Sequence, residues 1–382
     1  MTVQLPIKRI GMVGGGQLAR MLAPACAALQ VPLTVLDPMA GSPAGLVATA
    51  EHVGSLHDPD ALQALVNAVD VVSFDLENVG AETLTALAAA GATILPHPAV
   101  LQLIQNKWDQ KQHYLAHGIP TAPCRRVDGD WTSVSAFGIP CVQKTDVGGY
   151  DGRGVAVIRH EEDWQNRLPG DTFVEAFVAD AIELGVMVCC RASGELVTYD
   201  PVEMVVDPTL NLLKYLVAPA RIPEDVATRA QALAAKTVAS FGSPGLYGVE
   251  LFLTPQGELL VNEVAPRAHN SGHHTIEACV TSQFENQLRA LLDLPLGSTA
   301  LTRSAVMLNL VGAPGYQGTP VFDGLSTLLA MPDVHLHLYG KTECRPGRKM
   351  GHITVLGESM PELIALAETI ASSVVIRGEN QQ

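Results

Sequence analysis

The sequence predicts mixed α/β and α+β architecture: a parallel-sheet domain first, a domain with antiparallel strands in the middle and a small domain at the end. A strand–turn–helix–strand pattern fills residues 9–37, and short apolar strands with glycine-rich turns fill the middle. A further buried-type strand follows at residues 305–311. With 382 residues, 47% of them hydrophobic, the chain is long enough for two or three domains with separate cores.

Breaks in the pattern indicate where these domains meet. The stretch Thr93–Pro98 contains two prolines and marks the first boundary, near residue 100. The last segment begins at about Leu296. We therefore expect domains at residues 1–100, 101–295 and 296–382, with a lid subdomain at about residues 121–190.

Charge and composition exclude several classes of protein. The net charge of −15 argues against a general nucleic-acid binder, which needs surplus Lys and Arg for the phosphate backbone. No stretch resembles a signal peptide or a membrane span, so we expect a cytoplasmic protein without a membrane partner. The seven cysteines are scattered and odd in number, which predicts reduced, mostly buried thiols.

The first βαβ pattern contains a glycine-rich turn. Gly14-x-Gly16-x-x-Ala19 fits the dinucleotide-binding fingerprint, and Asp37 ends the second strand, where an acid could hold a ribose hydroxyl. An NAD(P)-dependent oxidoreductase is therefore the alternative function. The same glycines are selected by any strand-to-helix junction that brings backbone close to an anion, so the fingerprint alone does not decide.

A further parallel strand is expected at residues 71–74. Glu77 and Asn78 lie just past its end, and ligands of open α/β sheets collect at the carboxyl ends of strands. They can therefore reach a ligand, although solvated loop residues are the ordinary alternative. Lys107, in the amphipathic stretch that follows, would by itself be a surface lysine.

The middle of the chain contains a glycine loop between two strands. Gly148–Gly154 has four glycines in seven residues, follows the strand of Lys144 and precedes the apolar run Val155–Ile158. Such a hairpin lets backbone approach an anionic ligand such as a phosphate, whereas the alternative is a flexible turn. With strands at residues 172–178 and 185–190, it predicts a small antiparallel layer that carries the loop as a lid.

Two acids occupy apolar strands that follow a helix at residues 227–241. Glu250 lies in the strand 246–253 and Glu263 in the strand 258–264. Buried carboxylates are costly unless a cation meets them, and oxygen ligands without cysteine favour magnesium that bridges phosphates.

Polar residues crowd the stretch after the second acidic strand. Ala265–His274 contains Arg267, His269, Asn270 and Ser271. Capping of a helix near Thr275 could explain Asn270 or Ser271, but we favour contact with a ligand.

A basic stretch occurs near the end of this acidic chain. Lys341, Arg345, Arg348 and Lys349 accompany the single acid Glu343. This local excess of cations suits the phosphate of a substrate, and a solvated basic loop is the alternative.

Together these features resemble the ATP-grasp superfamily and, within it, the family of 5-(carboxyamino)imidazole ribonucleotide synthetases. The resemblance covers nearly the whole chain; the tracts from Asn262 and from Arg345 are specific, and the N-terminal glycines alone are not. The tracts that carry it are Gly14–Leu22, Gly148–Gly154, Asn262–His273 and Arg345–His352. It implies an ATP-grasp fold with an N-terminal Rossmann-like parallel-sheet domain and a small C-terminal domain.

The family resemblance also implies a reaction. ATP, bicarbonate and 5-aminoimidazole ribonucleotide give the carbamate at the exocyclic amine, ADP and phosphate, in de novo purine biosynthesis and without biotin. Bicarbonate attacks the γ-phosphate to form carboxyphosphate, and a closing lid keeps water away. Relatives are typically homodimers.

Site residues follow from the resemblance by matching positions. The metal ligands would be Glu250 and Glu263, for Mg²⁺. The ATP contacts would be Lys107, Lys144, Gly149, Tyr150, Asp151, Gly152, Arg153, Gly154, Glu175, Ala176, Phe177, Val178, Glu183 and Asn262. The contacts to the imidazole nucleotide would be Gln17, Leu18, Glu77, Tyr150, Asp151, Arg153, Arg267, His269, Asn270, Ser271, Lys341 and Arg348. The catalytic set would be Lys144, Tyr150, Asp151, Arg153, Arg267 and His269.

The chain departs from the family pattern at a few positions. Asp146 and Val147 stand where relatives commonly carry basic residues that could contact an anion. Asp207 falls where a histidine near ATP is usual, and His274 replaces a larger aromatic residue. In this interpretation the N-terminal domain binds the imidazole nucleotide, and Asp37 is structural.

Overall fold

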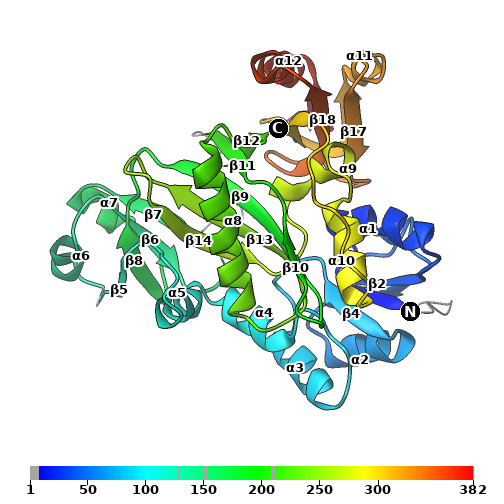
Figure 1. The fold of residues 1–382 in the computed structure, drawn as a ribbon, viewed down its shortest axis with the longest axis horizontal. Helices are drawn as coiled ribbons and strands as arrows, with labels where there is room; N and C mark the ends of the chain where they lie inside the picture. The colour runs from blue at the N-terminus through cyan, green and yellow to red at the C-terminus, as the bar shows by residue number, and fades with distance from the viewer. Residues whose placement is uncertain (1–7, 128, 149–153, 208–211, 382) are drawn as a thin grey trace.

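The computed structural model describes residues 8–127, 129–148, 154–207 and 212–381. The described strands form four sheets, and Figure 1 shows three regions along the chain. The N-terminal part lies beside the central sheet, a small sheet extends from the opposite end, and the last helices and strands lie above.

The N-terminal sheet is parallel throughout, as the sequence predicts. Its strand order is β3-β2-β1-β4. Its strands are β1 (Ile10–Val13), β2 (Leu33–Asp37), β3 (Ala50–Val53) and β4 (Val71–Phe74). The accompanying helices are α1 (Gln17–Ala28), α2 (Pro59–Ala68), α3 (Ala81–Ala89) and α4 (Pro98–Gln105). The turn after β1 and the acids after β4 therefore share one edge of the sheet.

The small sheet is antiparallel, in the order β5-β8-β6-β7. Its elements are β5 (Cys124–Arg126), α6 (Trp131–Phe137), β6 (Cys141–Thr145), β7 (Val155–Ile158), α7 (Glu161–Gln165) and β8 (Thr172–Ala176). Val134 and Trp164 from the helices pack with Cys141 and Val174 on one face. Because strand residues alternate, Lys144 and Glu175 point to the other face.

The large sheet joins the middle and the end of the chain. Its order is β14-β13-β9-β11-β12-β15-β18-β17, with β10 beside β9. Its first strands are β9 (Ile182–Cys190), β10 (Leu196–Thr198), β11 (Val202–Asp207), β12 (Leu212–Ala218), β13 (Gly245–Leu253) and β14 (Leu259–Ala265). From the last segment come β15 (Ser304–Val311), β17 (Val334–Leu338) and β18 (Lys349–Gly357). The C-terminal strands thus continue the central sheet.

Helices cover the large sheet, and a separate strand pair completes the end of the chain. The helices are α5 (Lys107–Ala116), α8 (Glu224–Ala239), η1 (Asn270–Gly272), α9 (Thr275–Ala278), α10 (Gln283–Leu291), α11 (Leu325–Leu329) and α12 (Met360–Ser373). The separate pair is β16 (Tyr316–Asp323) with β19 (Val375–Gln381).

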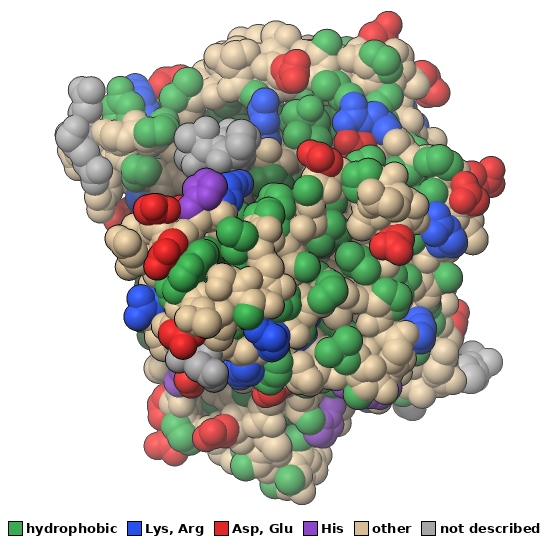
Figure 2. Space-filling model, turned by 90° about the vertical axis from the view of Figure 1, so that its left-hand side faces the viewer, with side chains coloured by type: hydrophobic (Ala, Val, Ile, Leu, Met, Phe, Trp, Pro, Cys, Tyr) green, Lys and Arg blue, Asp and Glu red, His purple; other side chains and the backbone are tan. Residues whose placement is uncertain are grey.

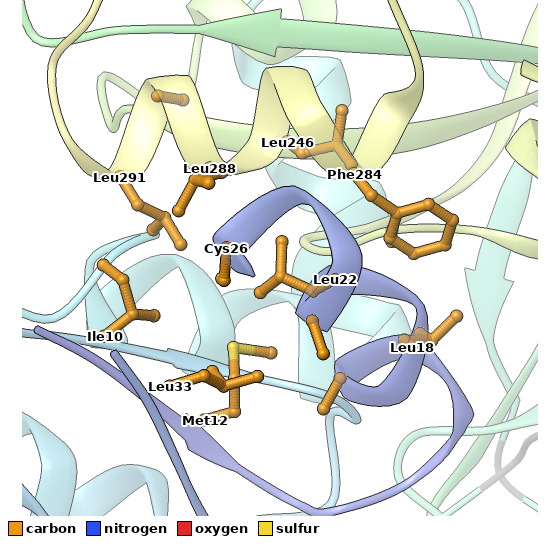
Figure 3. Packing of buried hydrophobic residues seen from close by; sticks show 14 of the residues in the cluster. Ile10, Met12, Leu18, Leu22, Cys26, Leu33, Leu246, Phe284, Leu288 and Leu291 are labelled. Carbon is orange, nitrogen blue, oxygen red and sulfur yellow. The ribbon is translucent and has the colours of Figure 1, made fainter. Parts of the chain in front are cut away.

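One apolar core fixes the N-terminal sheet to the rest. Helix α10 packs across α1, where Phe284 and Leu288 meet Leu18, Leu22 and Cys26 (Figure 3). Full burial of a Leu or Phe side chain contributes about 1.5–3 kcal/mol, so this contact holds the carboxyl edge of the parallel sheet at a fixed place beside β13 and β14.

All seven cysteines are free in the structure; four of them are buried and three are half-buried, which agrees with the prediction of mostly buried thiols. Within the described ranges, every helix is too short or too polar to cross a membrane. On the face viewed from the small-sheet side, acidic and basic side chains are interspersed among hydrophobic ones (Figure 2).

Candidate active site

The two predicted metal ligands face each other across neighbouring strands. Glu250 on β13 pairs in register with Glu263 on β14, and a bulge follows Glu250. Directly opposed residues project to the same side of a sheet, so their carboxyls come close. Their side chains retain 20% and 40% of their exposure, which leaves them accessible to a ligand. Asn262 donates to Glu250 Oε2 at 3.3 Å.

Two predicted lysines meet this acidic pair from different elements. Lys107 begins α5 directly after its N-cap, and its Nζ lies 2.6 Å from Glu263 Oε2. Lys144 on β6 lies 2.6 Å from Glu175 Oε1 and donates to Asn262 Oδ1 at 3.0 Å. Lys144 therefore ties the small sheet to the large one.

The carboxylates differ in their electrostatic surroundings. Burial, followed by the charges of Glu263 and Glu183, raises the pKa of Glu250 well above its ordinary value. The pKa of Glu263 is held low, chiefly by Lys107. Burial raises the pKa of Glu183 as well. The cluster thus has a surplus of acid that a cation would neutralise.

The donor set fits magnesium that is shared with a nucleotide. Across the described part of the chain, no group of three or more His, Cys, Asp or Glu side chains could hold a metal ion. Magnesium needs no such cage, because it keeps several waters and takes one or two carboxylates plus substrate phosphates. Glu250 and Glu263 supply that pair of carboxylates.

One buried lysine of the site was not predicted. Lys111 is 2% exposed, and its Nζ lies 2.9 Å from Glu175 Oε2 and 2.8 Å from Thr121 Oγ1. Burial lowers the pKa of Lys111; burial would raise that of Glu175, but Lys144 and Lys111 together lower it. Lys111 lies one helical turn after Lys107, a spacing that places both on one face and could have indicated it.

Two carboxylates of the protein itself accept hydrogen bonds from backbone N–H groups at the glycine turn after β1 and the start of α1. Gly15 N–H donates to Asp37 Oδ2 at 2.9 Å, and Ala19 N–H donates to Asp75 Oδ1 at 2.6 Å. A Cβ at Gly16 would lie 2.3 Å from Asp75 Oδ2. These acids take the amide donors that a dinucleotide phosphate would need, which removes the basis of the oxidoreductase alternative.

The polar run after β14 joins the acidic pair to the N-terminal domain. Arg267 Nη2 lies 2.9 Å from both carboxylate oxygens of Glu77, just past the end of β4. His269 Nδ1 lies 2.8 Å from Ser271 Oγ, and His269 Nε2 lies 3.4 Å from Glu250 Oε1. Ser271 itself is only 1% exposed.

Further predicted substrate contacts gather beside this run. Asn270 exchanges two amide hydrogen bonds with Asn309, at 2.9 and 2.8 Å. Burial raises the pKa of Asp75 to about 6, while the charges of Arg267 and Lys341 oppose the rise, so these cations lie within electrostatic reach of Asp75. The N-terminal edge, the polar run and the C-terminal segment therefore converge.

The remaining predicted residues have simpler surroundings. Gln17 is half-buried at the start of α1, whereas Leu18 is 7% exposed and belongs to the core. Lys341 Nζ donates to Lys349 O at 2.7 Å, and Arg348 Nη1 donates to Glu343 O at 2.8 Å. Three half-buried residues follow or end β8, namely Ala176, Phe177 and Val178.

Part of the predicted glycine loop cannot be compared with the structure. Thr145 N–H donates to Gly154 O at 3.0 Å, and β6 and β7 pair antiparallel, so the strands of the predicted hairpin are confirmed. The predicted residues outside the described ranges are Gly149, Tyr150, Asp151, Gly152 and Arg153.

His274, one of the departures, is buried. Its Nδ1 lies 3.1 Å from Ser271 O, and burial lowers its pKa to about 4. Val147 is 60% exposed. A cavity of about 660 Å³ lies elsewhere, at the β5–β8 end of the small sheet between Arg126 and Arg167, and none of the predicted site residues lines it.

Comparison with known families covers all three regions. Residues 7–105 match the ribonucleotide synthetase preATP-grasp domain, and residues 112–284 match the ATP-grasp domain. Residues 305–366 match the phosphoribosylaminoimidazole carboxylase C-terminal domain.

Individual relatives match over nearly their whole length. N5-carboxyaminoimidazole ribonucleotide synthase of Synechococcus elongatus is 39% identical, over 97% of this chain and 95% of that protein. The synthetase structure from Thermotoga maritima has a TM-score of 0.91 and 42% identity, and it covers 98% of this chain and 100% of its own. The Aspergillus clavatus synthase, solved with ADP and 5-aminoimidazole ribonucleotide, has a TM-score of 0.87 and 32% identity, with 95% and 99% covered. The chain therefore belongs to the N5-carboxyaminoimidazole ribonucleotide synthase family and has the ATP-grasp fold.

Proposed function

We propose that this protein carboxylates 5-aminoimidazole ribonucleotide in de novo purine biosynthesis. The reaction consumes ATP and bicarbonate and yields 5-(carboxyamino)imidazole ribonucleotide, ADP and phosphate. The observation that carries the proposal is the single polar run Arg267–Ser271, which touches the acidic pair through Glu250 and the N-terminal sheet through Glu77. One continuous site can thus hold ATP at one end and a second nucleotide at the other.

ATP would bind between the small and large sheets. Glu250 and Glu263 would hold Mg²⁺, which when bound neutralises charge on the phosphate oxygens. Lys107 and Lys144 stand beside these acids and would stabilise the negative charge that develops on the transferred phosphoryl group. We assign Glu183 to the ribose and the segment 175–178 to the adenine, with Asn262 and Gly154 beside the phosphates.

The chemistry would proceed in two steps. A bicarbonate oxygen attacks the γ-phosphorus, the bond to the β-phosphate oxygen breaks, and ADP leaves with carboxyphosphate formed. Carboxyphosphate then breaks into carbon dioxide and phosphate, and the exocyclic amine adds to carbon dioxide with loss of a proton. Arg267 and His269 lie between the two ends of the site, where they would orient carboxyphosphate next to the amine.

The imidazole nucleotide would bind where the three regions converge. Gln17, Glu77 and Asn270 would contact its ring and ribose, with Leu18 packing beside them, while Ser271 would act by holding His269. Lys341 and Arg348 would bind its phosphate as cations. The roles of Tyr150, Asp151 and Arg153, and of the loop glycines, remain predictions.

The assembly and setting of the enzyme are also proposals. We propose a cytoplasmic homodimer. We further propose domains at residues 1–100, 101–295 and 296–382, with a lid subdomain at about 121–190 whose own sheet ends with β8.

The decisive experiment measures ADP formation in bicarbonate buffer with and without 5-aminoimidazole ribonucleotide. We expect ADP only with the nucleotide, or far faster with it. No stimulation would overturn the proposal, and ATP binding without turnover would indicate a nucleotide-binding regulator. Binding of a nicotinamide cofactor, followed by fluorescence quenching, should be absent because Asp37 and Asp75 take the amide donors.

A further inference from the structure

Asp146 is a buried acid that the proposed reaction does not use. It is 5% exposed and lies two residues after Lys144, on the same face of the small sheet. Arg126, at the end of β5, donates two hydrogen bonds to the Asp146 carboxylate, at 2.7 and 2.5 Å. Such a bidentate pair fixes direction as well as distance.

The same arginine reaches the helix that carries the other catalytic-site lysine. The Arg126 guanidinium lies 4.7 Å from the centre of the Trp108 ring, and the Trp108 ring also packs on Phe173, with ring centres 5.5 Å apart. Arg126 and Phe173 are paired across β5 and β8, so Trp108 contacts two neighbouring side chains of the small sheet. It follows Lys107 directly in the first turn of α5.

A backbone hydrogen bond also connects the first turn of α5 to the small sheet. The N–H of Lys107 donates to the carbonyl oxygen of Asp146 at 2.7 Å. Three contacts thus fasten the first turn of α5 to the small sheet: the Arg126 guanidinium beside the Trp108 ring, the Trp108–Phe173 ring contact and this hydrogen bond. The ion pair with Asp146 holds Arg126 in place within the small sheet.

We propose that Asp146, Arg126 and Trp108 form a clamp that positions Lys107 relative to Lys144. Lys107 reaches Glu263 from α5, and Lys144 reaches Asn262 from the small sheet. Together with the Lys111–Glu175 ion pair, the clamp joins those two elements, and it fixes where the first turn of α5, which carries Lys107, lies relative to Lys144. The inference rests on the proposed function, since it assigns these cations to ATP.

The experiment compares Arg126→Ala with the matched control Arg125→Ala. Arg125 is the preceding residue, lies 5.8 Å from the Phe137 ring on the other face and donates to Ser133 O. Displacement of a catalytic group by about 1 Å can cost roughly a hundredfold in rate. We expect Arg126→Ala to lower kcat by about ten- to a hundredfold, with a smaller change in KM for ATP, and Arg125→Ala to keep wild-type kinetics.

Conservative variants separate positioning from folding. Trp108→Phe keeps an aromatic ring in contact with Arg126 and Phe173 and should retain most of kcat, whereas Trp108→Ala should lose it to the same extent as Arg126→Ala. Wild-type kcat in Arg126→Ala, or equal losses in Arg126→Ala and Arg125→Ala, would overturn the clamp. If Arg126→Ala does not fold, the two Trp108 variants decide by the same criterion.

Binding of adenylyl-imidodiphosphate with Mg²⁺, measured by calorimetry, keeps this test separate from the proposed reaction. A wild-type enzyme that ignores 5-aminoimidazole ribonucleotide would overturn the proposed function alone. The clamp then still predicts about tenfold weaker binding of the analogue to Arg126→Ala than to Arg125→Ala, and equal affinities would refute it.

Discussion

Glu263 is the residue on which the acidic pair depends most. It stays ionised because Lys107 lies 2.6 Å away, and it can therefore bind a cation at neutral pH. We expect Glu263→Gln to abolish ADP formation, by at least about a hundredfold, because the amide cannot neutralise magnesium. Circular dichroism should show an unchanged fold. Exposed Glu258, just before the same strand, supplies the control Glu258→Gln, and equal activity of the two variants would contradict the assignment.

Asp75 offers a test of burial at a single carboxyl. Its pKa of about 6 exceeds the ordinary value of about 3.9, so the folded state favours the protonated form. This contribution to stability is fully present below about pH 4 and is lost as pH rises through about 6. Asn at this position can still accept from Ala19 but cannot ionise.

We therefore expect Asp75→Asn to gain stability relative to wild type as pH rises. Between about pH 5 and 8 the difference in unfolding free energy should grow by about 1–2 kcal/mol. Urea unfolding at the two pH values measures it. A difference that does not change with pH would mean that Asp75 ionises normally in the fold.

Individual site residues could be predicted from the sequence where a charged side chain occurs in an otherwise apolar strand. Acids within apolar strands indicated Glu250 and Glu263 without any structure. Lys111 was not predicted because a lysine in an amphipathic helix is ordinarily exposed. Its burial depends on the small sheet, which packs against the helix and supplies Glu175. Asp75 directly follows the predicted strand 71–74, but its contact with the start of α1 depends on β1 and β4 pairing in parallel.

The acidic strand pair β13–β14 predicts a pH effect on metal binding. Glu250 holds a proton in the free protein because burial and Glu263 raise its pKa, and it must lose that proton to bind a cation. Affinity for ADP with Mg²⁺ should therefore rise between about pH 6 and 9, with protons released.

Calorimetry in buffers of different ionisation enthalpy counts those protons. Glu250→Gln should bind more weakly and release fewer of them. An affinity that does not change with pH in the wild type would contradict a raised pKa. Removal of Mg²⁺ with a chelator should stop ADP formation altogether.

The C-terminal segment before β18 predicts a different kinetic signature. Arg348 is half-buried beside the proposed phosphate site, whereas Arg345 is exposed on the same turn. Arg348→Ala should raise KM for 5-aminoimidazole ribonucleotide about tenfold or more with little change in kcat, since it removes a contact present before and during reaction. Arg345→Ala should change KM far less. An unchanged KM in Arg348→Ala would refute the phosphate assignment.

Elements with local signals were predicted well. Alternation and glycine turns indicated the β6–β7 hairpin and the β13–β14 pair, because neighbouring strands meet through short turns. The pairing of β12 with β15 was not predicted. It joins strands nearly ninety residues apart, and no local pattern encodes such a partner.

At the scale of the whole molecule, the proposed substrate site exists only because three regions meet. Cationic side chains of this acidic protein gather there: Arg267 from the polar run after β14, and Lys341 and Arg348 from the C-terminal segment. The α1–α10 core and the Arg267–Glu77 pair hold the N-terminal edge against this group. The sequence predicted the regions and, through family resemblance, their residues, but the geometry of their contact depends on packing between distant segments.

This convergence predicts where each ligand protects the backbone. A ligand that binds only the folded state stabilises every segment it contacts, by about 2.7 kcal/mol at a hundred times its dissociation constant. ADP with Mg²⁺ should slow hydrogen exchange in α5, β6, β13 and β14. The imidazole nucleotide should slow it in three separated segments, namely residues 14–20, 267–271 and 341–349.

Mass spectrometry of peptides measures both patterns, and Glu77→Gln should weaken protection of residues 14–20 by the imidazole nucleotide. Protection of the central segment alone would mean that the nucleotide does not bridge the three regions, because a bound ligand cannot contact a backbone without slowing its opening.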